Sequence, residues 1–255
     1  GGYDRIAENI DRIAETDADF WIFSGDMNNT GSQDEWDSWF DVMDPLLNDT
    51  VLMPVQGNHE DYGEVFYAQF DLPIEDGLPE GYDEYAWSID VGNMHVIGLN
   101  SISTEIVTNQ LAWLEADLEA ANADPDIVWK VCFFHHPAYS ASTAHGSTDR
   151  IIEHFVPVFE QYGVDLTFSG HDHNYERTHP IRNDQVVGTD EGVTHIVAGA
   201  FFAPGYGNGN DWFTATSANG IASNYVVIDV EGSTLSATAF NGEGTVELDN
   251  FTITK

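Results

Sequence analysis

Four short apolar runs, each followed at once by a polar tip, constrain this chain more than any other feature of its sequence. The runs span residues 20–23, 51–55, 127–134 and 164–168, and they have the length and apolar character of buried strands. Each tip carries Asp, Asn or His, and the tips are Ser24-Gly25-Asp26, Gln56-Gly57-Asn58-His59, His135-His136-Pro137 and Ser169-Gly170-His171-Asp172-His173. The pattern predicts buried strands whose carboxyl ends carry the chemistry.

A segment with helical spacing precedes each of these strands. Apolar residues recur every three or four positions over residues 6–14, and the same spacing predicts helices through 36–43, 111–118 and 148–162. Two hairpins are expected as well, pairing 85–90 with 94–100 and 225–230 with 234–240. Helices alternating with strands, together with these hairpins, predict an α/β fold with mixed sheets.

Acidic residues dominate the charge of the chain. Forty-four Asp and Glu face seven Lys and Arg, which gives a net charge of −37. Such a surface disfavours nucleic-acid polymers and membranes as partners. Because self-repulsion weakens a compact acidic protein unless salt screens it, we expect a halophilic source, with an acidic exported protein of an ordinary organism as the alternative.

The length and the hydrophobic content of the chain indicate how many domains it forms. The 42% of hydrophobic residues suffice for a core, and 255 residues without a linker predict one domain over 1–255. The single cysteine, Cys132, excludes an internal disulfide, and we expect it to be buried. The chain opens at Gly1 without Met, so we expect a secreted, periplasmic or extracellular protein, with the cytoplasm of a halophile as the alternative. The oligomeric state stays open.

The four polar tips offer carboxylate, amide and imidazole ligands without a thiolate. Ligands of open α/β sheets bind at the carboxyl ends of the strands, where the tips are expected to converge. Mixed oxygen and nitrogen ligation suits Zn, Mn, Fe, Co or Ni. Each tip alone has an ordinary explanation as a turn, but four in this order favour a metal site. His95, His154 and His195 are predicted to be structural, and the aromatic stretch 201–213 either rims the cleft or packs a loop.

The ordered tips resemble the blocks of the calcineurin-like metallophosphoesterase superfamily, namely G-D, G-N-H-[ED], a His after a strand, and G-H-x-H. The run His171-Asp172-His173-Asn174-Tyr175-Glu176-Arg177 is similar to the G-H-x-H-x-Y-E-R of the purple acid phosphatase-like branch. The resemblance implies a four-layer α-β-β-α sandwich with two mixed sheets. It also implies a centre of two divalent or trivalent metal ions.

The resemblance assigns roles to individual residues. Asp26 would bridge the metals, and His173 would hold the first metal. The ligands of the second metal would be Asn58, His135 and His171. The catalytic residues would be His59, at the phosphorus, and His145, near the leaving group. Residues expected to contact the metal ligands or the substrate are His136, Glu60, Asp172 and Arg177. Glu60 and Asp172 either orient imidazoles or face solvent, and for Arg177 a buried ion pair is favoured over direct contact with phosphate.

The activity implied is hydrolysis of small phosphate esters, with monoesters expected, by in-line attack of a metal-bound hydroxide. The motifs leave open a phosphodiesterase or nucleotidase with the same site. They also leave open a non-catalytic metal-binding domain, because the first block of the superfamily, an Asp at the end of a strand, does not precede Asp26. We expect the natural polypeptide to extend upstream of Gly1 and to supply that strand. Asn29 stands where the purple branch has a tyrosine, so the site should be colourless.

Overall fold

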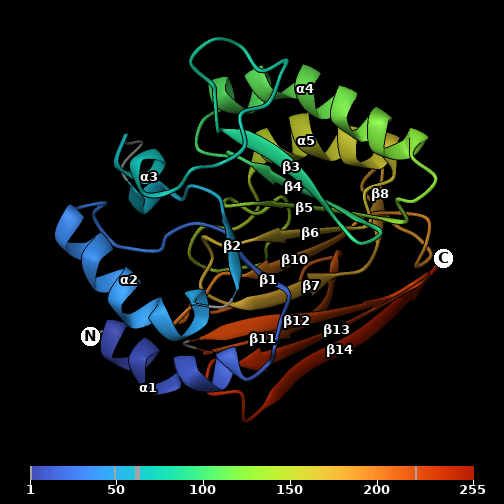
Figure 1. Cartoon of the computed structure of the whole chain (residues 1–255). Helices are drawn as coiled ribbons and strands as arrows, with labels where there is room; N and C mark the ends of the chain where they lie inside the picture. Colours follow the sequence, from blue (N-terminus) through green and yellow to red (C-terminus); the bar gives the residue numbers. More distant parts are fainter. Residues whose placement is uncertain (1, 49, 61–63, 222) are drawn as a thin grey trace.

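The computed structural model describes residues 2–48, 50–60, 64–221 and 223–255. Helices α4 (Thr104–Ala123) and α5 (Asp149–Tyr162) cover one face of a large sheet, and strands β12 (Asn224–Glu231), β13 (Thr234–Asn241) and β14 (Glu247–Thr254) lie across its other face (Figure 1). Helices α1 (Gly2–Ala14) and α2 (Gln33–Leu47) pack together against that second layer. The succession of layers is the expected helix, sheet, sheet, helix.

The large sheet has seven strands in the order β11-β7-β10-β6-β5-β4-β3. Its central strands β10, β6, β5 and β4 are parallel, whereas β3, β7 and β11 run antiparallel to a neighbour. The strand bounds are β3 Ala86–Val91, β4 Met94–Leu99, β5 Trp129–Phe134, β6 Leu166–Ser169, β7 Tyr175–Thr178, β10 Thr194–Ala198 and β11 Thr214–Ala218. Every residue of β4, β5 and β6 is buried, as apolar runs between two layers require.

The second layer consists of two separate pieces. Strands β1 (Phe20–Phe23) and β2 (Val51–Pro54) form a parallel pair, and β12, β13 and β14 form an antiparallel sheet. A groove of about 640 Å³, lined by β1 and β12, separates them. Within the described residues β1 pairs only with β2, and β12 only with β13. The predicted fold class is confirmed, with the second sheet divided by this groove.

The predicted helices and strands are present, with shifted ends. Helix α4 is longer than predicted because Ser103 caps it by accepting a hydrogen bond from the Ile106 amide. Strands β7, β11 and β14 were not predicted. The other short elements are η1 (Asn58–Glu60), α3 (Glu64–Gln69), β8 (Ile181–Arg182) and β9 (Gln185–Val186). Cys132 is buried, and no helix within the described residues is long and apolar enough to cross a membrane.

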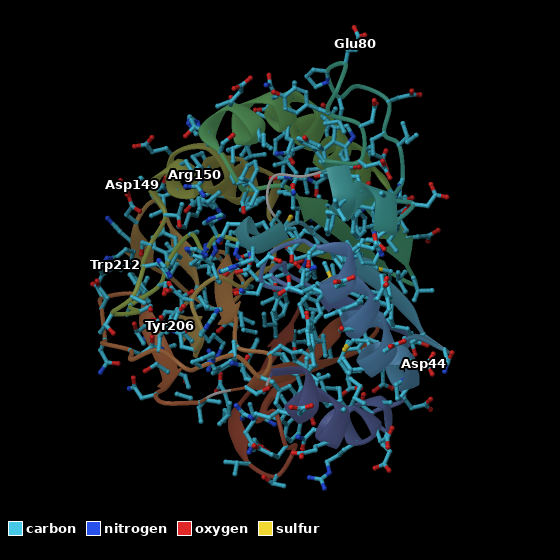
Figure 2. The ribbon with its side chains drawn as sticks, turned by 90° about the vertical axis from the view of Figure 1, so that its left-hand side faces the viewer. Asp44, Glu80, Asp149, Arg150, Tyr206 and Trp212 are labelled. Carbon is cyan, nitrogen blue, oxygen red and sulfur yellow. The ribbon has the colours of Figure 1, made fainter. Side chains whose placement is uncertain are left out.

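Carboxylates cover the outside of the molecule. Asp44 on α2, Glu80 in a loop and Asp149 at the start of α5 all point outward at the periphery (Figure 2). Because these groups belong to different elements and lie far apart in the view, the acidity is spread over the surface.

Candidate metal centre

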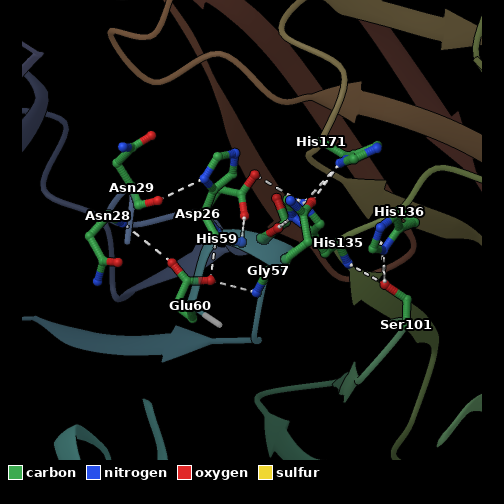
Figure 3. Close-up of polar contacts among 12 residues, drawn as sticks. Asp26, Asn28, Asn29, Gly57, His59, Glu60, Ser101, His135, His136 and His171 are labelled. Carbon is green, nitrogen blue, oxygen red and sulfur yellow. Dashed lines mark hydrogen bonds and ion pairs between the residues drawn. The ribbon is translucent and has the colours of Figure 1, made fainter. Parts of the chain in front are cut away.

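Four side chains from four strand ends meet at one edge of the layers (Figure 3). Asp26 follows β1, Asn58 follows β2, His135 follows β5 and His171 follows β6. Asn58 Oδ1 lies 2.9 Å from His135 Nε2 and 2.8 Å from His171 Nδ1. The two imidazole nitrogens are 3.2 Å apart, and Asp26 Oδ2 lies 3.1 Å from His135 Nε2. We call these four side chains the four-donor cluster.

The spacing of these donor atoms fits a metal ion. Ligands about 2.0–2.1 Å from a tetrahedral Zn²⁺ are roughly 3.3 Å from one another, close to the separations seen here. The oxygen and nitrogen atoms of the four side chains gather at one place. The donor set, with one carboxylate, one amide oxygen and two imidazoles, suits a borderline divalent cation.

Hydrogen bonds on the far side of the rings orient the imidazoles. His135 Nδ1 donates to the Ser24 carbonyl oxygen at 2.7 Å, which leaves the Nε2 lone pair directed at the cluster. His173 Nδ1 donates to the Pro204 carbonyl oxygen at 2.9 Å, and its ring stacks on Tyr206 with centroids 4.3 Å apart. His173 Nε2 is therefore also available as a ligand. Within the described residues no hydrogen bond joins His173 to the four-donor cluster.

The surroundings favour an ionised Asp26 carboxyl and a neutral His171 ring, and these are the forms that bind a metal. Burial opposes ionisation of Asp26, but His135 and the His59 amide lower the pKa of that carboxyl to about 2. Burial, together with His135 and His145, lowers the pKa of His171 to about 3, so this ring is neutral. For His135 burial lowers the pKa, while Asp26 raises it and prevails. A metal therefore competes with a proton for His135 Nε2.

The backbone at the cluster is strained. Asp26 has φ 58° and His171 has φ 64°, in the left-handed region that costs a residue with a side chain about 1 kcal/mol or more. A Cβ at Gly57 would clash with the Asp26 amide, so glycine is required for the approach of the two loops. Strain of this kind persists where the surroundings hold a functional geometry.

Comparisons with known proteins agree with this geometry. The sequence model of the calcineurin-like phosphoesterase family matches residues 1–175. This chain belongs to that family. Rv2577, an uncharacterized protein of Mycobacterium tuberculosis, is 31% identical over 205 residues, covering 71% of this chain and 38% of the relative. Purple acid phosphatase 18 of Arabidopsis thaliana is 29% identical over 202 residues, covering 74% of this chain and 45% of the relative.

A solved structure shares the fold of this phosphoesterase. The purple acid phosphatase PPD1 isolated from yellow lupin (Lupinus luteus) seeds superposes with a TM-score of 0.83 at 21% identity, covering 98% of this chain and 48% of that one. The predicted family and its purple acid phosphatase-like branch are thus confirmed. The phosphoesterase chain spans less than half the length of each of these three proteins.

His59 and His145 stand at the open side of the centre, and both are exposed. His59 donates from its amide to Asp26 Oδ1 at 2.9 Å and from Nδ1 to the Asn29 carbonyl oxygen at 2.9 Å. The His145 ring lies 4.2 Å from that of His171. Neither ring hydrogen bonds to the four-donor cluster, as suits groups that would face a substrate.

His136 is buried behind the cluster. The Ser101 hydroxyl accepts the amides of His135 and His136 and therefore donates its own proton to His136 Nδ1, at 3.1 Å. Burial and the neighbouring His135 lower the pKa of His136 well below its usual range. His135, His136 and His171 each bring a nitrogen within 4.8 Å of the others, so His136 borders the ligands as a neutral ring.

Two carboxylates were predicted either to orient imidazoles or to face solvent, and this prediction is wrong. Glu60 accepts the amides of Gly57 at 2.6 Å, Asp26 at 3.0 Å and Asn28 at 3.3 Å, so it ties together the loops after β1 and β2. Burial, then Asp26, raises the pKa of Glu60. Asp172 accepts from Ser140 and Gly146 instead. Loop amides outcompete the imidazoles because each must find a buried acceptor.

Arg177 forms the buried ion pair that the sequence favoured. Its Nε lies 2.6 Å from Asp249 Oδ2 on β14, and its guanidinium stacks over Phe251. His95 is structural as predicted, since it lies between Asp90 and Asp117 at 2.7 and 2.8 Å. His195 is buried on β10 beside Thr167.

Three residues that orient the imidazoles were not predicted from the sequence, namely Ser24, Ser101 and Pro204. The sequence does contain a pattern that could have identified Ser101. This residue lies two positions beyond the apolar strand β4 and so belongs to a fifth polar tip. Ser24 and Pro204 act through backbone carbonyls, which no side-chain pattern reveals. Tyr206, in the aromatic stretch expected to rim the cleft or pack a loop, contacts both His173 and His145.

Proposed function

We propose that this phosphoesterase hydrolyses small phosphate esters, with monoesters preferred, at a centre of two metal ions. The observation that carries the proposal is the convergence of Asp26, Asn58, His135 and His171 donors at separations of 2.8–3.2 Å. Similarity to proteins such as purple acid phosphatase 18 supports a phosphatase activity.

The ligands divide between two positions. Asn58, His135 and His171 would hold one ion, His173 would contribute to the other, and Asp26 would serve both. When bound, the cations supply positive charge that polarises the phosphoryl group and promotes ionisation of the attacking water. Neutral His171 leaves that charge uncancelled, and Glu60 keeps the Asp26 and Asn58 loops in register.

The exposed imidazoles would act on the substrate. His59 donates from Nδ1 to the Asn29 carbonyl oxygen, which directs Nε2 away from that bond; in its doubly protonated form the ring would donate from Nε2 to a phosphoryl oxygen in the transition state. The His145 ring lies beside that of His171, where it would give a proton to the leaving oxygen.

The groove between β1 and β12 belongs to the same proposal. It is bordered by two strands that lack a second partner within the described residues, and its lining includes Asp26 and His173. We propose that an extended strand of the same polypeptide fills it and ends in an aspartate beside His173. This strand would complete the ligands of the ion that His173 holds.

A panel of phosphate esters tests the function. Wild-type protein loaded with Zn²⁺, Mn²⁺ or Co²⁺ should release inorganic phosphate from glycerol phosphate and p-nitrophenol from p-nitrophenyl phosphate, and should release p-nitrophenol more slowly from bis-p-nitrophenyl phosphate. Faster release from the diester or from nucleotides would favour the diesterase or nucleotidase alternative. No release from any ester by the metal-loaded chain would leave a non-catalytic metal-binding domain and sink the proposal.

The acidic surface supports a further part of the proposal. We propose that the protein works at high salt, because the carboxylates that give it a net charge of −37 are spread over the surface and repel one another unless ions screen them. Activity that is highest at low salt and absent at molar sodium chloride would contradict it.

A further inference from the structure

His145 stands on a loop that has no helix or strand of its own. Residues 140–147 form only an isolated bridge, between Ser142 and Asn208, yet the His145 ring lies 4.2 Å from the His171 ring. The side chain is exposed, and within the described residues its ring contacts are with His171 and, at 5.7 Å between centroids, with Tyr206, so packing holds it only weakly. Its position depends on whatever fixes the loop backbone.

The carboxylate of Asp172 fixes both ends of this loop. Asp172 Oδ2 accepts a hydrogen bond from the Ser140 hydroxyl at 2.7 Å and another from the Gly146 amide at 3.1 Å. Gly146 directly follows His145 and has φ 83°, a conformation that strains residues with a side chain. One oxygen atom thus closes the loop at the residue next to His145.

Other contacts hold the first half of the loop. The Ala141 amide donates to Glu176 Oε2 at 2.8 Å, and the Thr143 amide donates to the Gly207 carbonyl oxygen at 2.8 Å. These bonds come before His145 in the chain and do not restrain the peptide that follows it.

The Ser147 hydroxyl also joins the two ends, because it accepts from the Ser140 amide at 3.0 Å and donates to the Ser140 carbonyl oxygen at 3.3 Å. Asp172 differs from these contacts in that it holds the peptide directly after His145.

Asp172 also lies between His171 and His173 in the turn after β6. Its contacts therefore connect the turn that carries two imidazoles of the centre with the loop that carries His145. The residue is fully buried, and its Oδ1 has no hydrogen-bond partner within the described residues. Burying a carboxylate with an unsatisfied oxygen costs stability, so packing alone does not account for an acid at this position.

We propose that Asp172 is a positioning residue that holds His145 over the leaving group of the substrate. The inference rests on the proposed function, in which the P–O bond breaks, its electron pair stays on the leaving oxygen, and that oxygen takes a proton from the His145 imidazolium. Asp172 touches neither substrate nor imidazole and acts through Ser140 and Gly146.

The test uses the metal-loaded protein and two esters whose leaving groups differ in basicity. Glycerol phosphate needs a proton on its leaving alkoxide, whereas p-nitrophenolate leaves without one. Asp172→Ala and His145→Ala should each lower kcat for glycerol phosphate about 10- to 100-fold and affect p-nitrophenyl phosphate much less. Metal content should equal that of wild type. In the double variant the loss should be no larger than in His145→Ala alone, because both changes remove the same proton transfer.

Three further variants keep the test decisive. Asp172→Asn retains an oxygen that can accept from Ser140 and Gly146, so it should keep most of the activity. Ser140→Ala removes one bond and should lower kcat for glycerol phosphate in the same direction by a smaller factor, which serves if Asp172→Ala does not fold. Asp117→Ala is a matched control, because it removes a carboxylate on α4 that bonds to His95 and Ser88. It should lower the melting temperature without changing the ratio of the two ester rates.

Multiplied losses in the double variant, equal losses on both esters, or loss of metal in Asp172→Ala would each overturn the inference. An inactive wild-type protein would instead refute the proposed function, so the two failures are distinguishable.

Discussion

On the side of the large sheet, His135 and His171 follow strands β5 and β6, in which every residue is buried. On the other side, Asp26 follows β1, whose four residues are all half-buried and border the groove of about 640 Å³. Each imidazole of the first side stands on a strand that is paired along both edges, whereas β1 is paired along one edge within the described residues. This difference indicates that the fold prearranges the half of the centre beside the large sheet, whereas the geometry of the half that borders the groove depends on what fills the groove.

The hydrogen bonds join the side chains of the prearranged half. His135 is anchored to Ser24, and His171 contacts both Asn58 and His135, so Asn58 belongs with these two imidazoles although it follows β2. His173 follows β6 like His171 but borders the groove, and within the described residues its ring contacts Pro204 and Tyr206. We therefore expect ligand changes on the prearranged half to have the largest consequences.

Removing a ligand from the prearranged half should abolish function. His171→Ala or Asn58→Ala should lose a metal equivalent and more than about 10²-fold in kcat, beyond the cost of losing a supporting hydrogen bond alone. Metal analysis by mass spectrometry and phosphate release from p-nitrophenyl phosphate measure both quantities. Normal metal content with full activity in either variant would show that the four-donor cluster is not the metal site.

Removing His59 should separate catalysis from metal binding. His59→Ala should lower kcat roughly 10²–10³-fold, the usual cost of one preorganised donor to the transition state, with nearly unchanged metal content. The same two assays apply. Loss of metal here would mean that His59 is a ligand rather than a catalyst.

Salt should stabilise the strands that border the groove more than it stabilises the large sheet. Asp17, Asp19 and Asp229 line the groove, so their mutual repulsion falls as salt shortens the screening length to about 3 Å at 1 M. From low to molar sodium chloride, amide hydrogen exchange in β1 should slow by a larger factor than in β5, and the melting temperature should rise. A melting temperature that falls steadily with salt would contradict the screening argument.

A smaller effect should come from His95, which ties β4 to α4 on the large sheet. Burial lowers its pKa, but Asp117 and Asp90 raise it and prevail, so the charged ring contributes stability below its unfolded pKa of about 6.5. That contribution is lost as pH rises through the higher folded value. His95→Gln should lower the melting temperature by a few degrees at pH 6 and by less at pH 9. An equal loss at both pH values would show that His95 is not charged.

The sequence predicted the prearranged half well because local patterns encode it. Apolar runs such as residues 129–134, followed by a polar tip, show where a buried strand ends, and parallel strands bring those ends together. Strands β7 and β11 escaped prediction because Tyr175–Thr178 and Thr214–Ala218 contain many polar residues and show no apolar alternation.

The partners of Glu60 and Asp172 could not be predicted for a different reason. Glu60 binds amides up to 34 positions away, and Asp172 binds Ser140, 32 positions away. Such contacts depend on how loops from separate strands approach, and no local spacing encodes that approach. Both residues were recognised as belonging to the site, but their roles required the fold.

Metal titration of the 255-residue protein tests the difference between the two halves most directly. Isothermal calorimetry with Zn²⁺, supported by metal analysis after dialysis, should show one equivalent held tightly by Asn58, His135, His171 and Asp26. A second equivalent should bind at least about tenfold more weakly, because His173 and Asp26 alone offer too few donors. Two equivalents held with equal affinity, or no tight equivalent at all, would contradict the account.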